Sequence, residues 1–154
     1  MKIDIGLTNN VREEIRGALS KFLADVYAIY LKTQKFHWNV KGDQFFSLHL
    51  MLEKQYEEMA EEIDEVAERI QILGFPVEAS FGIFKELTTI SEEGNVGSAK
   101  EMLELLIQGH EVIVRNGRYL ATMAEKHEDV ATVDMMGRRI GGHEKILWML
   151  RSHL

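Results

Sequence analysis

The sequence predicts an all-α protein, a bundle of four long helices in a single domain over residues 1–154. Four segments carry apolar residues at three- and four-residue spacing, the period of a helix with one buried face. The chain has one proline and no cysteine among 154 residues, so helices have few interruptions and no disulfide is available. Apolar residues make up 45% of the chain, an ordinary fraction for a globular core of this size.

The first predicted helix covers residues 11–36 and follows a short N-terminal extension, residues 1–8. Its candidate N-caps are Thr8, Asn9 and Asn10. Residues 40–43 contain Gly42-Asp43 and predict a turn. The second predicted helix covers residues 45–73 and carries an apolar stripe of Leu52, Tyr56, Met59, Ile63, Val66 and Ile70. Gly74 is a natural C-terminal cap, and Pro76 prevents continuation.

Residues 75–97 predict a long connection with a short helix around residues 81–87. The end of this connection is marked by Gly94, Asn95 and Gly97. Ser98 and Glu101 then form a capping-box pattern, which starts a helix that continues to residue 126. Asp129 is a candidate N-cap for the last helix, which reaches residue 153. One long connection between the second and third helices is typical of ferritin-like four-helix bundles. Gly141-Gly142 weakens the last helix, and we interpret the pair as a site of close helix packing.

Candidate metal ligands gather on the second helix. At ~100° per residue, with His49 at zero, Glu53 lies near 40°, Asp64 near 60° and Glu68 near 100°. The apolar stripe is centred near roughly 300°, so we interpret these four residues as one flank of the buried face. His37, at the end of the first helix, supplies a second histidine. Two histidines with carboxylates suit iron(II), with zinc and manganese also possible.

One helix cannot hold one ion at both of its ends. Glu53 and Asp64 are separated by ~16 Å along the axis, whereas metal–ligand bonds are ~2 Å long. Two copies of the helix, packed antiparallel about a two-fold axis, would bring His49 and Glu53 of one subunit to Asp64 and Glu68 of the other. The alternative is that these carboxylates form a solvated face with Glu57, Glu58, Glu61, Glu62 and Glu65, and that His49 is a partly buried structural histidine.

The chain resembles the Dps family, the DNA-binding proteins from starved cells or miniferritins. The residues that carry the resemblance are His37-Trp38-Asn39-Val40-Lys41-Gly42, Phe45, Leu48-His49, Tyr56, Asp64, Ala67-Glu68-Arg69-Ile70, Leu73-Gly74, His143-Glu144-Lys145 and Trp148-Met149-Leu150-Arg151. The resemblance covers about residues 8–154. It implies a shell of twelve subunits with ferroxidase sites at two-fold interfaces and ferric mineral inside.

Carried over by position, the resemblance implies His37 and His49 as ligands from one subunit, and Asp64 and Glu68 as ligands from its neighbour. Glu53 stands where the family usually has aspartate, so its reach differs by one methylene. Trp38 lies beside the site in the family, and core packing is its alternative role. Acidic residues near the last helix junction line three-fold pores in such shells, which makes Asp129 and Asp134 candidates. N-capping is the alternative for Asp129, and a surface charge for Asp134.

No histidine has glutamate three positions before it, which argues against the Glu-x-x-His motif of a di-iron centre within one bundle. The resemblance therefore implies a ferroxidase that oxidises Fe(II), with hydrogen peroxide preferred over dioxygen, and stores ferric oxyhydroxide. One alternative is a DNA-compacting nucleoid protein with secondary iron chemistry, and another is a structural helical oligomer. Lys2 is the only basic residue before Arg12, and the net charge of −7 disfavours phosphate binding. No apolar run spans a membrane, so the expected location is the cytoplasm.

Overall fold

The computed structural model describes residues 3–92 and 97–154, and these residues contain helices but no strand. The helices are α1 (Asn9–Asn39), α2 (Phe45–Ile72), α3 (Phe81–Leu87), α4 (Ala99–Lys126) and α5 (Val130–Arg151). The predicted connection residues Gly94 and Asn95, and also Lys2, lie outside the described residues. The all-α prediction and the short helix at residues 81–87 are confirmed.

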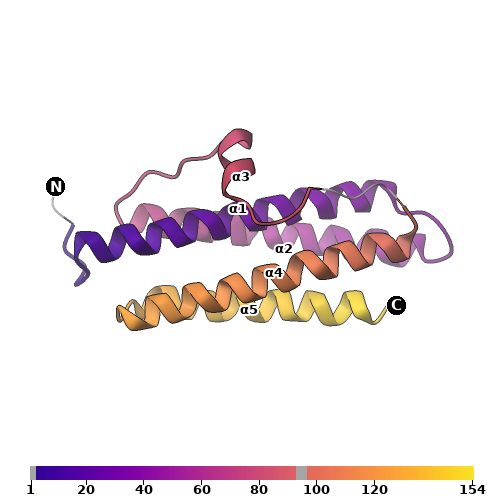
Figure 1. Cartoon of the computed structure of the whole chain (residues 1–154). Helices are drawn as coiled ribbons and strands as arrows, with labels where there is room; N and C mark the ends of the chain where they lie inside the picture. The colour runs from indigo at the N-terminus through magenta and orange to yellow at the C-terminus, as the bar shows by residue number, and fades with distance from the viewer. Residues whose placement is uncertain (1–2, 93–96) are drawn as a thin grey trace.

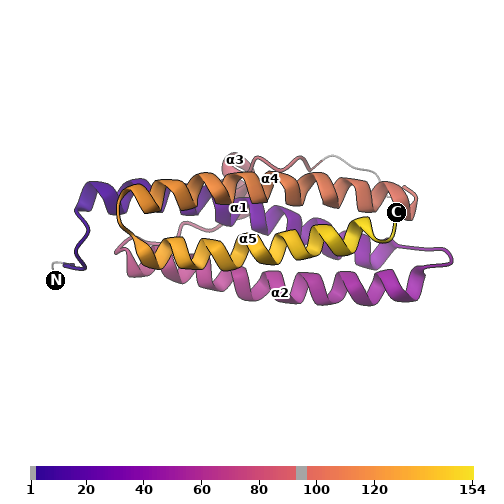
Figure 2. The same cartoon turned by 90° about the horizontal axis from the view of Figure 1, so that it is seen from below.

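Four long helices lie side by side, and α3 stands off the bundle beside α1 (Figure 1). A short loop joins α1 to α2 as an antiparallel hairpin. The chain after α2 then runs back along the length of the bundle, so that α4 begins at the same end as α2 (Figures 1 and 2). A connection of this length is needed because α2 and α4 are parallel. Helix α1 packs against α2 and α4, and α5 packs mainly against α4.

Local capping chemistry explains where the helices begin and end. The Thr8 side chain accepts from the Val11 amide at the start of α1, and Asp129 accepts from the Thr132 amide at the start of α5. Ser98 and Glu101 form both hydrogen bonds of a capping box on α4. Gly74 follows α2 with a φ of +92°, a conformation that favours glycine. The predicted caps are therefore confirmed.

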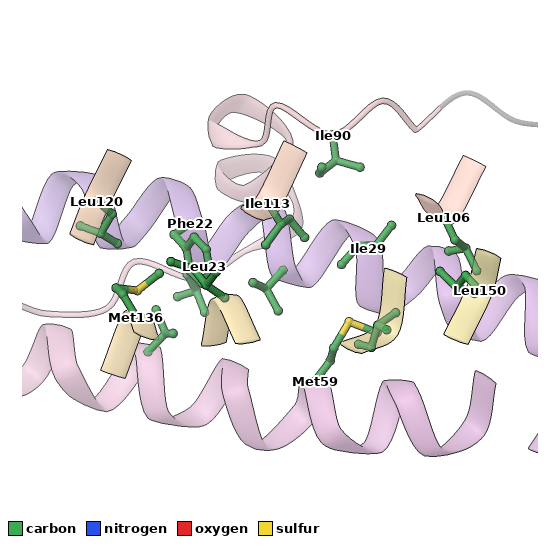
Figure 3. Packing of buried hydrophobic residues seen from close by; sticks show 14 of the residues in the cluster. Phe22, Leu23, Ile29, Met59, Ile90, Leu106, Ile113, Leu120, Met136 and Leu150 are labelled. Carbon is green, nitrogen blue, oxygen red and sulfur yellow. The ribbon is translucent and has the colours of Figure 1, made fainter. Parts of the chain in front are cut away.

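The core fills the space between the four long helices with aliphatic side chains, phenylalanine and methionine (Figure 3). Phe22 and Ile29 of α1 face Leu106 and Ile113 of α4 across this core, and Ile90 of the crossover is also buried. A Cβ at Gly109 of α4 would lie 2.5 Å from the Cδ1 atom of Ile29. Glycine at this position therefore lets α4 approach α1 closely.

The interpretation of Gly141-Gly142 as a close-packing site is wrong within this chain. A Cβ added to either glycine would meet nothing within 4 Å, and both residues are exposed. Close approach depends instead on glycines of α4: Gly109 packs against α1, and a Cβ at Gly117 would lie 3.0 Å from the Cγ1 atom of Ile140 on α5. Among the described residues, no helix is both long enough and apolar enough to cross a membrane.

Candidate metal centre

Two histidines meet at the hairpin between α1 and α2. His37 is in the last turn of α1 and His49 is in the second turn of α2. Their rings stack with centroids 3.8 Å apart and an interplanar angle of 16°. His37 is buried, whereas His49 is half-buried. The hairpin therefore places these two predicted ligands side by side.

Reciprocal backbone hydrogen bonds define the protonation of both rings. The Nδ1–H of His37 donates to the His49 carbonyl at 2.7 Å, and the Nδ1–H of His49 donates to the His37 carbonyl at 2.9 Å. A carbonyl oxygen can only accept, so Nδ1 carries the proton in both imidazoles. In the neutral ring, Nε2 then holds the lone pair that binds a metal. The backbone thus fixes the orientation of both rings, each with an Nε2 atom that is a candidate metal ligand.

Aromatic side chains surround the histidine pair. Phe45 stacks on His49 at 5.0 Å, and the Tyr56 ring meets the edge of His37 at 5.3 Å. Burial raises the pKa of the Tyr56 phenol, and the negative charges of Glu53 and Glu57 raise it further. Trp38 points away from the core and is 63% exposed. The core-packing alternative for Trp38 is therefore wrong within one chain.

The carboxylate candidates divide into two groups along α2. Glu53 lies one turn after His49 and is half-buried, whereas Asp64 and Glu68 are exposed. Because α2 is one continuous helix, Asp64 lies ~22 Å from His49 along the axis. Within the described residues of a single chain, no group of three or more acidic or histidine side chains converges to hold a metal ion. One chain therefore brings together His37, His49 and the neighbouring turn that carries Glu53, and leaves Asp64 and Glu68 apart.

The prediction that Asp64 and Glu68 lie on one flank of the buried face is wrong within one chain, because both residues are exposed. The prediction of a solvated face is in turn wrong for Glu62, which is only 5% exposed. On the helical wheel Glu62 lies about 80° from the centre of the apolar stripe. That angle is smaller than for Asp64 or Glu68, so the sequence contained a signal for its burial.

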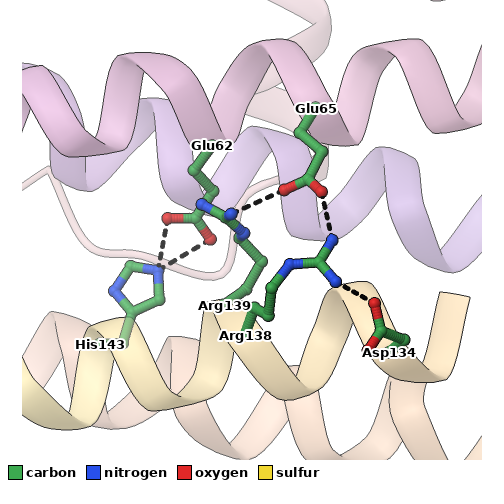
Figure 4. Close-up of polar contacts among 6 residues, drawn as sticks. All are labelled: Glu62, Glu65, Asp134, Arg138, Arg139 and His143. Atoms are coloured by element: carbon green, nitrogen blue, oxygen red, sulfur yellow. Dashed lines mark hydrogen bonds and ion pairs between the residues drawn. The ribbon is translucent and has the colours of Figure 1, made fainter.

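Glu62 belongs to a buried hydrogen-bonded chain that crosses the bundle. The Nε2 atom of His143, on α5, lies 3.1 Å from both carboxylate oxygens of Glu62 (Figure 4). The Nδ1 atom of His143 lies 2.8 Å from the Nδ1 atom of His110, on α4. Burial lowers the pKa of His110 well below its usual value, and the neighbouring His143 lowers it further. The pairing of these two histidines depends on the register between α4 and α5, which the sequence pattern does not indicate.

The acidic residues at the start of α5 are engaged in ion pairs. Asp129 is buried, caps α5 and accepts from Arg69 at 2.6 Å. Burial alone would raise the pKa of Asp129, but hydrogen bonds from Arg69 and Thr132 lower it overall. The capping alternative for Asp129 is thus confirmed. Asp134 is exposed, and Arg138 joins its carboxylate to Glu65 on α2 (Figure 4).

Comparisons with known proteins agree with this architecture. The ferritin-like domain family matches residues 16–154. The chain is 40% identical to an uncharacterized low temperature-induced protein of Nostoc sp., over 99% of this chain and 87% of the relative. It is 37% identical to the DNA protection during starvation protein (Dps) of Porphyromonas gingivalis, over 88% of this chain and 85% of that one.

Solved structures give the same result for the fold. DpsC from Streptomyces coelicolor superposes with a TM-score of 0.96 at 30% identity, covering 99% of this chain and 90% of that one. The Dps protein from Vibrio cholerae superposes with a TM-score of 0.93 at 29% identity, covering 99% and 96%. That protein is described as a member of a broad superfamily of ferritin-like diiron-carboxylate proteins.

Proposed function

The chain belongs to the Dps group of the ferritin-like family, and from that premise we propose that it oxidises ferrous iron and stores the ferric product. Iron is the substrate and cargo of this reaction. Two ferrous ions give one electron each to hydrogen peroxide, which takes up two protons and forms two water molecules. Pairing the electrons in this way avoids the release of hydroxyl radical.

The observation that carries the proposal is the reciprocal hydrogen bonding of His37 and His49. Both imidazoles are held by the backbone with Nδ1 protonated, so both Nε2 atoms have the lone pair that Fe(II) binds. Glu53, one turn further along α2, can supply a carboxylate oxygen to the same ion.

The remaining ligands in this proposal come from a second copy of the chain. Asp64 and Glu68 are exposed and therefore available to a neighbour. Two α2 helices packed antiparallel about a two-fold axis bring these carboxylates to the histidine pair, which gives two equivalent sites per dimer. We extend this arrangement to a shell of twelve subunits with the mineral inside. Asp134 stays the candidate for a pore, whereas the buried ion pair of Asp129 leaves its carboxylate unavailable.

Protection of DNA follows in this proposal from removing reactive iron. Direct contact with DNA is disfavoured by a net charge of −7 on each chain. A gel shift at low and moderate salt separates the two mechanisms, because retained binding at moderate salt would favour direct contact. A cytoplasmic location stays a prediction.

The decisive experiment measures iron oxidation after anaerobic loading with Fe(II) and addition of hydrogen peroxide. The test variant combines Asp64→Asn with Glu68→Gln, which removes two charges and keeps both shapes. The matched control combines Glu58→Gln with Glu61→Gln, two exposed residues of the same helix. Size-exclusion chromatography establishes that all three proteins have the same assembly state.

We expect fast oxidation in the parent and the control, and its loss in the test variant. Equal slow rates in all three proteins would contradict the ferroxidase proposal and favour a structural role for the acidic stripe. A parent that oxidises iron quickly and a test variant that keeps this rate would instead contradict the intersubunit ligands alone.

A further inference from the structure

The core of the bundle contains a polar side chain that has no partner on either of its polar atoms. Gln55 of α2 is only 2% exposed. Among the residues that the structure describes, neither its amide oxygen nor its amide nitrogen has a hydrogen-bond partner. On α4, the Nε2 atom of the fully buried His110 is also without one. Unpaired polar groups in a core are costly, so both residues require an explanation.

The direction of the hydrogen bonds that begin at Glu62 determines what His110 lacks. The Glu62 carboxylate accepts, so the Nε2–H of His143 donates to it at 3.1 Å. The Nδ1 atom of a neutral His143 then accepts, and the Nδ1–H of His110 donates to it at 2.8 Å. Burial favours a neutral His110, because it lowers the pKa of this imidazole well below its usual value. The Nε2 atom of His110 therefore carries a lone pair and needs a hydrogen-bond donor.

The two unpaired side chains lie at the same level of the bundle. Each has a sequence neighbour that contacts α1: Tyr56 meets the Tyr30 ring, and Gly109 lies against Ile29. Since Tyr30 and Ile29 are consecutive, the two side chains are separated by no more than about one helical turn, ~5 Å, along the bundle. Helices α2 and α4 are parallel (Figures 1 and 2), and side chains lean toward the N-terminus of their helix. Both side chains therefore lean toward the same end of the bundle.

Both side chains also face the interior between the four helices. Gln55 is seven residues before Glu62 and shares the face of α2 that reaches His143 on α5. His110 is seven residues before Gly117, where a Cβ would lie 3.0 Å from a side chain of α5 and 3.3 Å from one of α1. Over the described residues, α2 and α4 do not contact each other directly. Neighbouring helices pack about 8–10 Å apart, so these diagonal helices are roughly 11–14 Å apart, a distance that two long side chains and one small molecule between them can span.

We propose that the core binds one ordered water molecule between His110 and Gln55. The water donates one hydrogen to the Nε2 lone pair of His110, and it makes a second hydrogen bond with the Gln55 amide, which can both donate and accept. Buried waters typically make about two to four hydrogen bonds to polar groups that would otherwise be unpaired. The site also explains the glutamine at position 55, because a core amide is unfavourable unless it is hydrogen-bonded.

The bound water completes a polar connection between the two halves of the bundle. The printed hydrogen bonds run from Glu62 on α2 to His143 on α5 and then to His110 on α4. The water continues this chain from His110 back to α2 at Gln55. It thereby joins two diagonal helices that have no direct contact in the described part of the chain. Each polar side chain of the series then has a partner, independently of any iron chemistry.

High-resolution crystallography of the metal-free protein tests the site directly, and anomalous scattering separates water from a metal ion. Gln55→Met is the test variant, because methionine has a similar length and no amide. Gln71→Met is the matched control, which makes the same exchange at an exposed position of α2. Thermal unfolding of the three proteins, at equal protein concentration, measures how much the amide and its water contribute.

We expect one density peak without anomalous signal in the parent, about 2.7–3.2 Å from both the His110 Nε2 atom and the Gln55 amide. Gln55→Met should lower Tm by roughly 2–4 °C, whereas Gln71→Met should leave it unchanged. An anomalous peak, no peak at this place, or a Gln55 amide bonded directly to His110 would overturn the proposal. A higher Tm in Gln55→Met than in the parent would do the same, because the amide would then be unpaired in the parent.

Discussion

Replacement of His143 by leucine tests the buried hydrogen-bonded chain that joins α2, α5 and α4. His143 is 1% exposed and Glu62 is 5% exposed. The Nε2 atom of His143 lies 3.1 Å from the Glu62 carboxylate. Leucine at position 143 leaves Glu62 without this donor and His110 without its Nδ1 partner. The substitution thus strands two buried polar groups rather than one.

The expected loss of stability is large. An unsatisfied buried polar group costs about 1–3 kcal/mol, and this substitution leaves two such groups. The leucine side chain recovers part of the cost through its apolar surface, so we expect a net loss of about 3 kcal/mol. For a domain of this size, that corresponds to a fall in Tm of roughly 6–12 °C.

His127→Leu is a matched control for this prediction. His127 also pairs with a glutamate, Glu14, at 3.0 Å, but that pair lies on the surface. Exposed pairs contribute at most about 1 kcal/mol, so the control should lose little stability. The double variant Glu62→Leu, His143→Leu should recover part of the loss, because it removes the stranded carboxylate but leaves His110 without its partner.

Thermal unfolding of the metal-free protein, followed by circular dichroism, measures all four proteins. Protein concentration must be equal throughout, because assembly contributes to Tm. Equal stability of His143→Leu and His127→Leu would refute the argument that burial determines the cost. A double variant no more stable than His143→Leu would refute the coupling between Glu62 and His143.

Three further predictions concern stability and local order. The pKa of His110 in the fold lies well below its ordinary value of 6.5, so the unfolded chain binds more protons below that pH. The free energy of unfolding should therefore decrease by up to ~1.4 kcal/mol for each unit by which the pH falls below 6.5. In urea unfolding at several pH values, His110→Gln should reduce this slope. Asp25 is 1% exposed and accepts from two threonines of the crossover and one asparagine of α4; Asp25→Ala should cost about 3 kcal/mol and speed hydrogen exchange at the Thr89 amide. Ser98→Ala removes the capping box of α4 and should cost about 1 kcal/mol, with faster exchange confined to the first turn.

Much of the fold could be predicted because it depends on neighbours within four residues along the chain. The Thr8 and Ser98 caps, the turn after Gly74 and the short helix at residues 81–87 all arise from local hydrogen bonds and backbone preferences. The apolar period of α2 indicated its buried face in the same way. The spacing of Glu53 and Asp64 along that helix was also sufficient to predict that one chain cannot close the metal site around both.

Contacts between helices depend on how each helix is rotated and displaced against the next, so they could not be predicted from local patterns. The meeting of Glu62, His143 and His110 requires the register of α5 against both α2 and α4. The burial of Asp129 depends on the reach of Arg69 from α2, and the tautomers of His37 and His49 depend on the geometry of the hairpin that brings their backbones together. Which residues each helix presents and where each helix stops follow from the sequence alone, because both depend on local interactions. Which side chains then pair was decided by the packing of the bundle, because a core close to crystal density admits few arrangements of its helices.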